Sequence, residues 1–304
     1  MMRPHPEPTT GAKHVILHGD CWPVVSAVEN AVKAVLPRCL CTTAPDVVSL
    51  TQLLASHPRA VMVFCLRPRE HIFLFYRLRK ALCRHPALVI SDEFFFSDRI
   101  LLRMLGQLPC MDHQSLLRMI TSQQLCGLYA DAVPYCPEDS LLTRFLLSPS
   151  LPPGVPERIP VFLLEAPLME YLSLMMYREM TARGVSSLRL RLLQEMYAGH
   201  QHLDELARLL GVTKQKVWNE KHQLLLRLEM TDHLREIMYG TRFCLFLQRT
   251  PFRGPGEDVG LCEVTDDDGA TGFAGESGET AGRRMPLRQG AGQTGVRDRQ
   301  REDG

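Results

Sequence analysis

The chain has 304 residues, a formal net charge of +1 and a pI near 7.6, with 45% hydrophobic and 23% charged residues. A net charge this small excludes a global attraction to nucleic acid or to an anionic membrane surface, so any site for a polyanion must be local. The composition is that of a globular protein, and the length suggests about two domains.

The N-terminal stretch MMRPHPEPTTGAKHV contains prolines and no apolar core of a signal peptide, and no segment reaches the roughly 18 apolar residues of a membrane span. We therefore expect a cytoplasmic protein. The ten cysteines are scattered and include no CxxC motif. The one close pair, Cys39 and Cys41, fits two small buried residues on one face of a strand or a weak metal or redox signal. We expect no metal site and no cofactor.

Short apolar runs alternate with helical patterns from His14 onward. We predict strands at 15–19, 38–42, 60–65, 87–91 and, more weakly, 106–110, separated by helices at 22–36, 45–56, 69–85 and 97–105. Strands that alternate with helices of this length predict a parallel sheet covered on both faces. We therefore expect residues 14–125 to form an α/β doubly wound domain with a five-stranded parallel sheet.

Prolines cluster in the next stretch, 126–165, where we expect a linker without helix or long strand. An amphipathic helix rich in methionine and leucine is predicted at 166–180, either as core or as a subunit contact, and the linker with this helix spans 126–184. From about residue 250 the composition shifts to Gly, Asp, Glu, Arg and Thr. Such a segment cannot bury enough apolar surface to fold, so 250–304 is predicted to be a disordered tail.

Residues 185–249 are predicted to be all α-helical. A first helix follows the cap at Ser186 or Ser187 and ends at Gly199, and a second covers 203–210 before Gly211. Thr213 then caps a third helix. Two short helices joined by a three-residue turn form a helix-turn-helix, whose second helix enters the major groove of DNA in proteins that bind with this motif.

The outward residues at the start of this third helix suit DNA. Lysine binds phosphate or guanine, the side-chain amides of Gln and Asn bind adenine, and an exposed Trp contacts sugar or a thymine methyl. Glu220 would repel phosphate unless it pairs with Lys216 or accepts from a cytosine amino group. A plain helical bundle with a solvated polar face is the other interpretation. The candidate DNA-binding residues are Thr213, Lys214, Gln215, Lys216, Trp218, Asn219, Lys221 and His222.

Residues 185–230 resemble the four-helix DNA-binding domain of the LuxR/FixJ family, with a fourth helix from 232 to about 240. That family has a Leu-Thr-Pro-Arg-Glu opening, an Ile-Ala-x-x-Leu-Gly-Ile-Ser turn and a closing Lys-Leu-Gly-Val. The opening proline and glutamate are missing here, one residue is inserted after Gly199, and Trp218, Glu220 and His222 replace a lysine, a histidine and a basic residue. The matching positions are Ser187, Gly199, Leu206 and Ala207, Leu210 to Thr213, Lys216 and Val217, and Arg227 to Met230.

The resemblance implies that the upstream half is a receiver domain. A working receiver has two acidic residues after strand one, which hold Mg²⁺, and an aspartate that accepts phosphate at the end of strand three. A Ser or Thr ends its strand four, and a lysine follows strand five; together these groups neutralise the incoming phosphoryl group. The corresponding residues here are Asp20, Cys65, Ser91 and Cys110. With a thiol at the acceptor position, the resemblance implies a degenerate receiver that cannot be phosphorylated.

The chemical role of the Cys65 thiol has two further interpretations. It could be inert and buried, or it could be a redox thiol whose pKa is lowered by Arg67 and Arg69, which are close in sequence. If Cys65 and Cys110 approach each other in the fold, a redox-sensitive disulfide is also conceivable.

These expectations describe a transcription regulator that binds promoter DNA as a homodimer, or as a heterodimer with a LuxR-type regulator, independently of its own phosphorylation. The alternative is a protein-interaction adaptor that sequesters another regulator without binding DNA, which Glu220 and the near-neutral charge favour. We expect no enzyme, since the sequence has no Gly-rich phosphate loop, nucleophile elbow or metal quartet.

Overall fold

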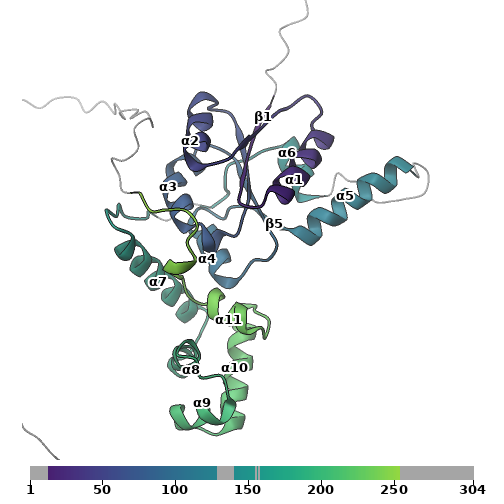
Figure 1. The fold of residues 1–304 in the computed structure, drawn as a ribbon. Coiled ribbons are helices and arrows are strands. Elements are labelled where there is room, and N and C mark those ends of the chain that lie inside the picture. The colour runs from purple at the N-terminus through teal and green to yellow at the C-terminus, as the bar shows by residue number, and fades with distance from the viewer. Residues whose placement is uncertain (1–12, 129–139, 155, 157, 254–304) are drawn as a thin grey trace, which may run out of the picture. The chain divides into compact units, whose positions relative to one another are not determined.

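The computed structural model describes residues 13–128, 140–154, 156 and 158–253, and the N-terminal half of this range forms a parallel α/β layer (Figure 1). Its strands are β1 (His14–Gly19), β2 (Leu40–Ala44), β3 (Val61–Cys65), β4 (Ala87–Ser91) and β5 (Cys110–Asp112). All four neighbouring pairs are parallel, in the order β2-β1-β3-β4-β5. The expected five-stranded doubly wound sheet is confirmed.

Helices cover both faces of this sheet, because its strands are apolar on both sides. The helices are α1 (Trp22–Val35), α2 (Val47–Ser56), α3 (Ile72–Leu82), α4 (Phe96–Met104) and α5 (His113–Leu128), with a short 3-10 turn, η1 (Pro68–Glu70), before α3. Helices α2, α3 and α4 pack on one face, while α1 and α5 pack on the other (Figure 1). Phe64 and Phe75 lie on the first face, fully buried.

The proline-rich stretch contains a helix that the sequence did not lead us to expect. Helix α6 (Leu141–Leu147) begins at Ser140, whose hydroxyl accepts from the Thr143 amide at 3.1 Å, and it buries Leu142, Phe145 and Leu146 in the core beside α1. The prolines stand outside these seven residues, so they bound the helix without breaking it. The predicted domain boundaries at 125 and 184 stay predictions.

Five more helices and a 3-10 turn follow in the described residues. Helix α7 (Glu165–Ala182) buries a stripe of leucine and methionine side chains, as its amphipathic pattern predicts. Helices α8 (Ser187–Tyr197), α9 (Leu203–Leu210), α10 (Lys214–Leu228) and α11 (Leu234–Gly240) form the predicted helical region, and a 3-10 turn, η3 (Leu245–Leu247), follows. Across the described residues, no helix is both long enough and apolar enough to span a membrane.

The sequence analysis placed the start of the disordered tail too early, at residue 250. Thr250 is buried, and the Phe252 ring lies 5.3 Å from that of Phe73 and 6.1 Å from that of Tyr76. Residues 250–252 therefore belong to the packed structure, because an aromatic ring in this polar stretch finds apolar partners on α3. Residues 254–304 of the predicted tail lie outside the described residues.

Candidate nucleic-acid interface and the carboxyl edge of the sheet

The turn between α9 and α10 has the geometry of a helix-turn-helix. Helix α9 ends at Gly211, whose φ of 66° lies in the left-handed region that favours glycine, and Thr213 accepts from the Lys216 amide at 3.2 Å to cap α10. Ala207 of α9 is buried, and its small side chain lets the two helices approach. Val217, Leu224, Leu225 and Leu228 of α10 face the helical core.

The structure places the predicted DNA-binding residues together between the cap of α10 at Thr213 and the start of its third turn at His222, and most of them are exposed. Trp218 is 50% exposed and stacks on His222, with ring centroids 5.5 Å apart and planes inclined by 2°. The Gln215 amide donates to Asn219 Oδ1 at 3.3 Å. The outward face of α10 is therefore a row of amide and ring side chains flanked by lysines.

Each lysine of this face has an acidic partner. Lys214 pairs with Asp204 of α9, and Lys221 pairs with Asp232 at 2.6 Å. Such surface pairs are worth at most about 1 kcal/mol, so a phosphate can replace the carboxylate.

Glu220 is held differently. It accepts from Lys216 Nζ at 2.7 Å and from Arg189 Nε at 2.7 Å, and only 12% of its side chain is exposed. The hydrogen bond from Lys216, followed by that from Arg189, holds the pKa of the Glu220 carboxyl below its usual value. Pairing with Lys216 was one of the two conditions under which the sequence allowed this acid on a DNA-facing helix.

The carboxyl edge of the sheet is the second candidate site, because the strand order reverses between β1 and β3 and ligands of open α/β sheets bind at such points. Asp20 follows β1, Cys65 ends β3 and Ser91 ends β4, so three of the four predicted phospho-site residues meet there. Cys110 does not. It begins β5, paired with Val89, and the residue level with Ser91 is Asp112. The predicted strand at 106–110 is too early, because β5 has only three residues and begins directly after Pro109, so its apolar pattern is too short to locate its start.

Cys65 is an enclosed thiol. It is 2% exposed, and burial raises its pKa to about 12. Gly19 of β1 lies against it: a Cβ at position 19 would stand 2.8 Å from Cys65 Cβ. The conceivable disulfide with Cys110 is excluded, because β4 lies between β3 and β5 and two strand spacings amount to about 9.5 Å.

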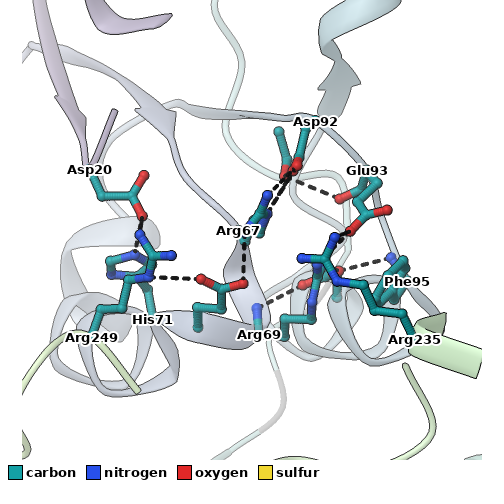
Figure 2. Close-up of polar contacts among 12 residues, drawn as sticks. Asp20, Arg67, Arg69, His71, Asp92, Glu93, Phe95, Arg235 and Arg249 are labelled. Carbon is teal, nitrogen blue, oxygen red and sulfur yellow. Dashed lines mark hydrogen bonds and ion pairs between the residues drawn. The ribbon is translucent and has the colours of Figure 1, made fainter. Parts of the chain in front are cut away.

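Arg67, two residues after β3, occupies the edge beside Cys65. Its Nε donates to both carboxylate oxygens of Asp92, at 2.9 and 3.1 Å, and its Nη1 donates to Glu70 at 3.1 Å (Figure 2). Burial alone would raise the pKa of Asp92, but the bidentate pair with Arg67 lowers it well below its usual range. The Ser91 hydroxyl donates to Asp92 at 3.2 Å and to the Glu93 carbonyl at 3.1 Å.

A segment from beyond the helical region completes this edge. Arg249 pairs with Asp20 at 2.6 Å and with Glu70 at 2.8 Å (Figure 2). The Gln248 amide donates to the Arg69 carbonyl at 2.8 Å. His71 contacts both sides, with Thr250 Oγ1 2.9 Å from Nδ1 and Asp20 3.3 Å from Nε2. We call residues 244–252 the return segment, and we define the edge network as Asp20, Arg67, Glu70, His71, Asp92 and Arg249.

Sequence reasoning missed the edge network. Arg67 was considered only as a neighbour of Cys65, and nothing in the sequence joins Arg249 to Asp20, 229 positions away. Within the described residues, no group of three or more His, Cys, Asp or Glu side chains could hold a metal ion. The acids at this edge are instead paired with arginine and histidine.

Comparisons with known proteins give structural neighbours only. No protein-family model matches the chain, and no curated protein matches it either. A structure of two RcsB dimers bound to two parallel DNAs is 11% identical and has a TM-score of 0.45, and the match covers 75% of this chain and 98% of that one. RcsB from Salmonella enterica serovar Typhimurium bound to promoter rprA is 12% identical with a TM-score of 0.41, and the match covers 75% of this chain and 98% of that one. Full-length FixJ from B. japonicum is 13% identical with a TM-score of 0.28, and the match covers 75% of this chain and 95% of that one. Because these identities and TM-scores are low, the description of the fold rests on this chain's own sheet and helices.

We predict that Cys65 resists alkylation in the folded protein. A buried thiol with a pKa near 12 has almost no thiolate at pH 8, so iodoacetamide should modify it at least about 100-fold more slowly than the exposed Cys21 and Cys83. Peptide mass spectrometry over a time course measures the three rates, and protein unfolded in urea serves as the control. Modification of Cys65 as fast as Cys21 would restore the reactive-thiol interpretation.

We also predict that acid weakens the fold through the edge network. The pKa values of Asp92 and Asp20 are lowered in the folded protein, so the stability they contribute is present above about pH 4 and is lost as pH falls through the folded values. The urea midpoint should fall from pH 5 to pH 2, and less steeply in Asp92→Asn.

A double-mutant cycle tests whether the ion pair between Arg67 and Asp92 accounts for this pH dependence. Arg67→Gln combined with Asp92→Asn should lose little more stability than either change alone, because both remove the same pair. Additive losses would show that the pair contributes nothing.

Proposed function

We propose that this protein is a sequence-specific DNA-binding transcription regulator that reads promoter DNA with α10. The observation that supports this most directly is the capped three-residue turn between α9 and α10, which presents polar and basic side chains on the first turns of an otherwise well-packed helix. A helix held in this way can place Gln215, Asn219 and His222 at base edges while lysines contact the backbone. The function requires no catalysis.

We further propose that the sheet domain acts as a receiver that is not phosphorylated. The support is chemical: the residue at the acceptor position is a buried thiol, and the space beside it holds the bidentate pair of Arg67 with Asp92. An acyl phosphate needs a carboxylate here and a cation that is free to receive the phosphoryl group. The return segment supplies contacts across this edge without any phosphate.

In this proposal the active species is a homodimer, or a heterodimer with a LuxR-type regulator. Two-fold symmetry then sets half-sites about one helical turn of DNA apart, roughly 34–36 Å. A heterodimer would let a phosphorylatable partner supply the signal that this chain cannot accept.

An adaptor that sequesters another regulator without binding DNA is the second candidate. It is favoured by the acids around α10, since Asp204, Glu220 and Asp232 each pair with one of its lysines. The two functions differ in their dependence on salt. Phosphate contacts weaken steeply as salt rises, while a mainly apolar protein interface does not.

We predict that Lys216→Ala and Asn219→Ala each weaken binding to a duplex selected by the full chain from a random library. Each change should cost about tenfold in affinity, the worth of one charge-assisted or base-edge hydrogen bond. Lys216→Ala should also reduce the slope of log K against log salt by about one. Electrophoretic shifts over a salt series measure both effects.

The matched control is Lys80→Ala, which removes an exposed lysine of α3 outside the helical region. It should leave affinity and salt slope unchanged. Binding that survives both α10 substitutions would remove α10 from the interface, and failure to select any duplex would favour the adaptor.

We predict that acetyl phosphate with Mg²⁺ adds no phosphoryl group to the protein. Intact-mass spectrometry should show a single unmodified species, and the affinity for the selected duplex should be the same before and after treatment. A receiver that retains the acceptor aspartate, treated in parallel, provides the positive control. A stable covalent adduct on the sheet domain would refute phosphorylation independence while leaving DNA binding intact.

A further inference from the structure

A shallow hollow of about 290 Å³ opens at the start of α10, in the face proposed to meet DNA. It is lined by Leu203 at the beginning of α9 and by Lys214, Gln215 and Trp218 of α10. The indole of Trp218 is fixed from the other side by its parallel stack on His222, so its exposed surface is presented in one orientation. The hollow thus combines a fixed apolar wall with an amide at its rim.

The amide of Gln215 is also oriented. Its Nε2 donates one hydrogen to Asn219 Oδ1 at 3.3 Å, one turn further along α10. The second N–H and both lone pairs of Oε1 remain available to a ligand. Asn219, which the sequence suggested as a direct contact to adenine, therefore also positions Gln215 through its Oδ1, while its own side-chain N–H groups stay available to a base edge.

We infer that Gln215 and Trp218 together read one A·T base pair, with adenine on the Gln215 amide and the thymine methyl in the hollow beside Trp218; this inference rests on the proposed DNA-binding function. In the major groove adenine presents the N7 acceptor and N6 donor, and thymine presents its methyl on the same edge of the pair. Residues three apart on a helix lie about 5–6 Å from each other, so one amide and one apolar surface can meet the two halves of that edge.

The chemistry of the site argues against the other bases and against the phosphate backbone. Guanine presents two acceptors, and the one free donor of Gln215 cannot satisfy both. Cytosine has no methyl to fill the hollow. A phosphate could replace Asp204 on Lys214, but it would leave the apolar surface of Trp218 in the hollow without an apolar partner.

The test uses the full chain and the duplex it selects from a random library, with each thymine replaced in turn by deoxyuridine, which lacks only the methyl. At one position in each half-site, uracil should weaken binding about fourfold, the worth of one buried methyl. In Trp218→Ala the thymine and uracil duplexes should bind equally well. In Gln215→Ala the preference for adenine at the paired position should fall by about tenfold.

Trp22→Ala is the control, because Trp22 is the other tryptophan of the chain and is 78% exposed at the start of α1. It should retain the full thymine preference, and thermal melting should show that all three variants are folded. If the chain binds its selected duplex and uracil is tolerated at every position, the inference is wrong and DNA binding stands. If the chain selects no duplex, the proposed function fails as well.

Discussion

The buried ion pair between Arg69 and Asp98 is the constraint on which the carboxyl edge depends. Arg69 is 3% exposed and Asp98 is fully buried, with Nη1 to Oδ2 at 2.6 Å. Asp98 also accepts from the Arg69 and Phe95 amides, at 2.7 and 2.8 Å. Removing one partner of such a pair typically costs 3–5 kcal/mol, because the other charge is left buried. The pair therefore fixes the loop after β3 against the start of α4.

The remaining contacts of this edge are built on that fixed loop. Arg69 also reaches Glu93 at 2.9 Å, and Glu93 pairs in turn with Arg235 of α11 at 3.5 Å (Figure 2). On its other side, the carbonyl of Arg69 accepts from Gln248 of the return segment. A single exposed ion pair, such as that of Arg235 or of Arg249, contributes little to the stability of the fold. When one of its two side chains is already held rigidly, however, less conformational entropy is lost in forming the pair. The loop can thus hold the return segment in place without a bound ligand.

The sequence predicted what depends on local pattern, and missed what depends on distant pairing. Alternating apolar runs located all the strands except β5, whose three residues follow a proline, and the caps at Thr213 and Gly211 located the turn before α10. Helix α6 is seven residues long, too short for a periodic signal. The edge network joins residues 3 to 229 positions apart, and charged side chains at such distances leave no pattern in one sequence. The burial of Cys65 was open before the structure, since a strand end can be enclosed or exposed.

The two candidate sites also differ in how readily their ion pairs can be exchanged. At α10, Lys214 pairs with Asp204 and Lys221 pairs with Asp232, whose side chains are 74% and 62% exposed. A charge-assisted hydrogen bond to phosphate contributes about 1.5–3 kcal/mol, whereas an exposed ion pair of this kind contributes at most about 1 kcal/mol. At the sheet edge, Arg67 holds Asp92 in bidentate form and also bonds Glu70, which is 8% exposed. A phosphoryl group arriving there would have to break these bonds with no acceptor carboxylate to receive it. Anion exchange is therefore favourable at the helix and unfavourable at the sheet edge.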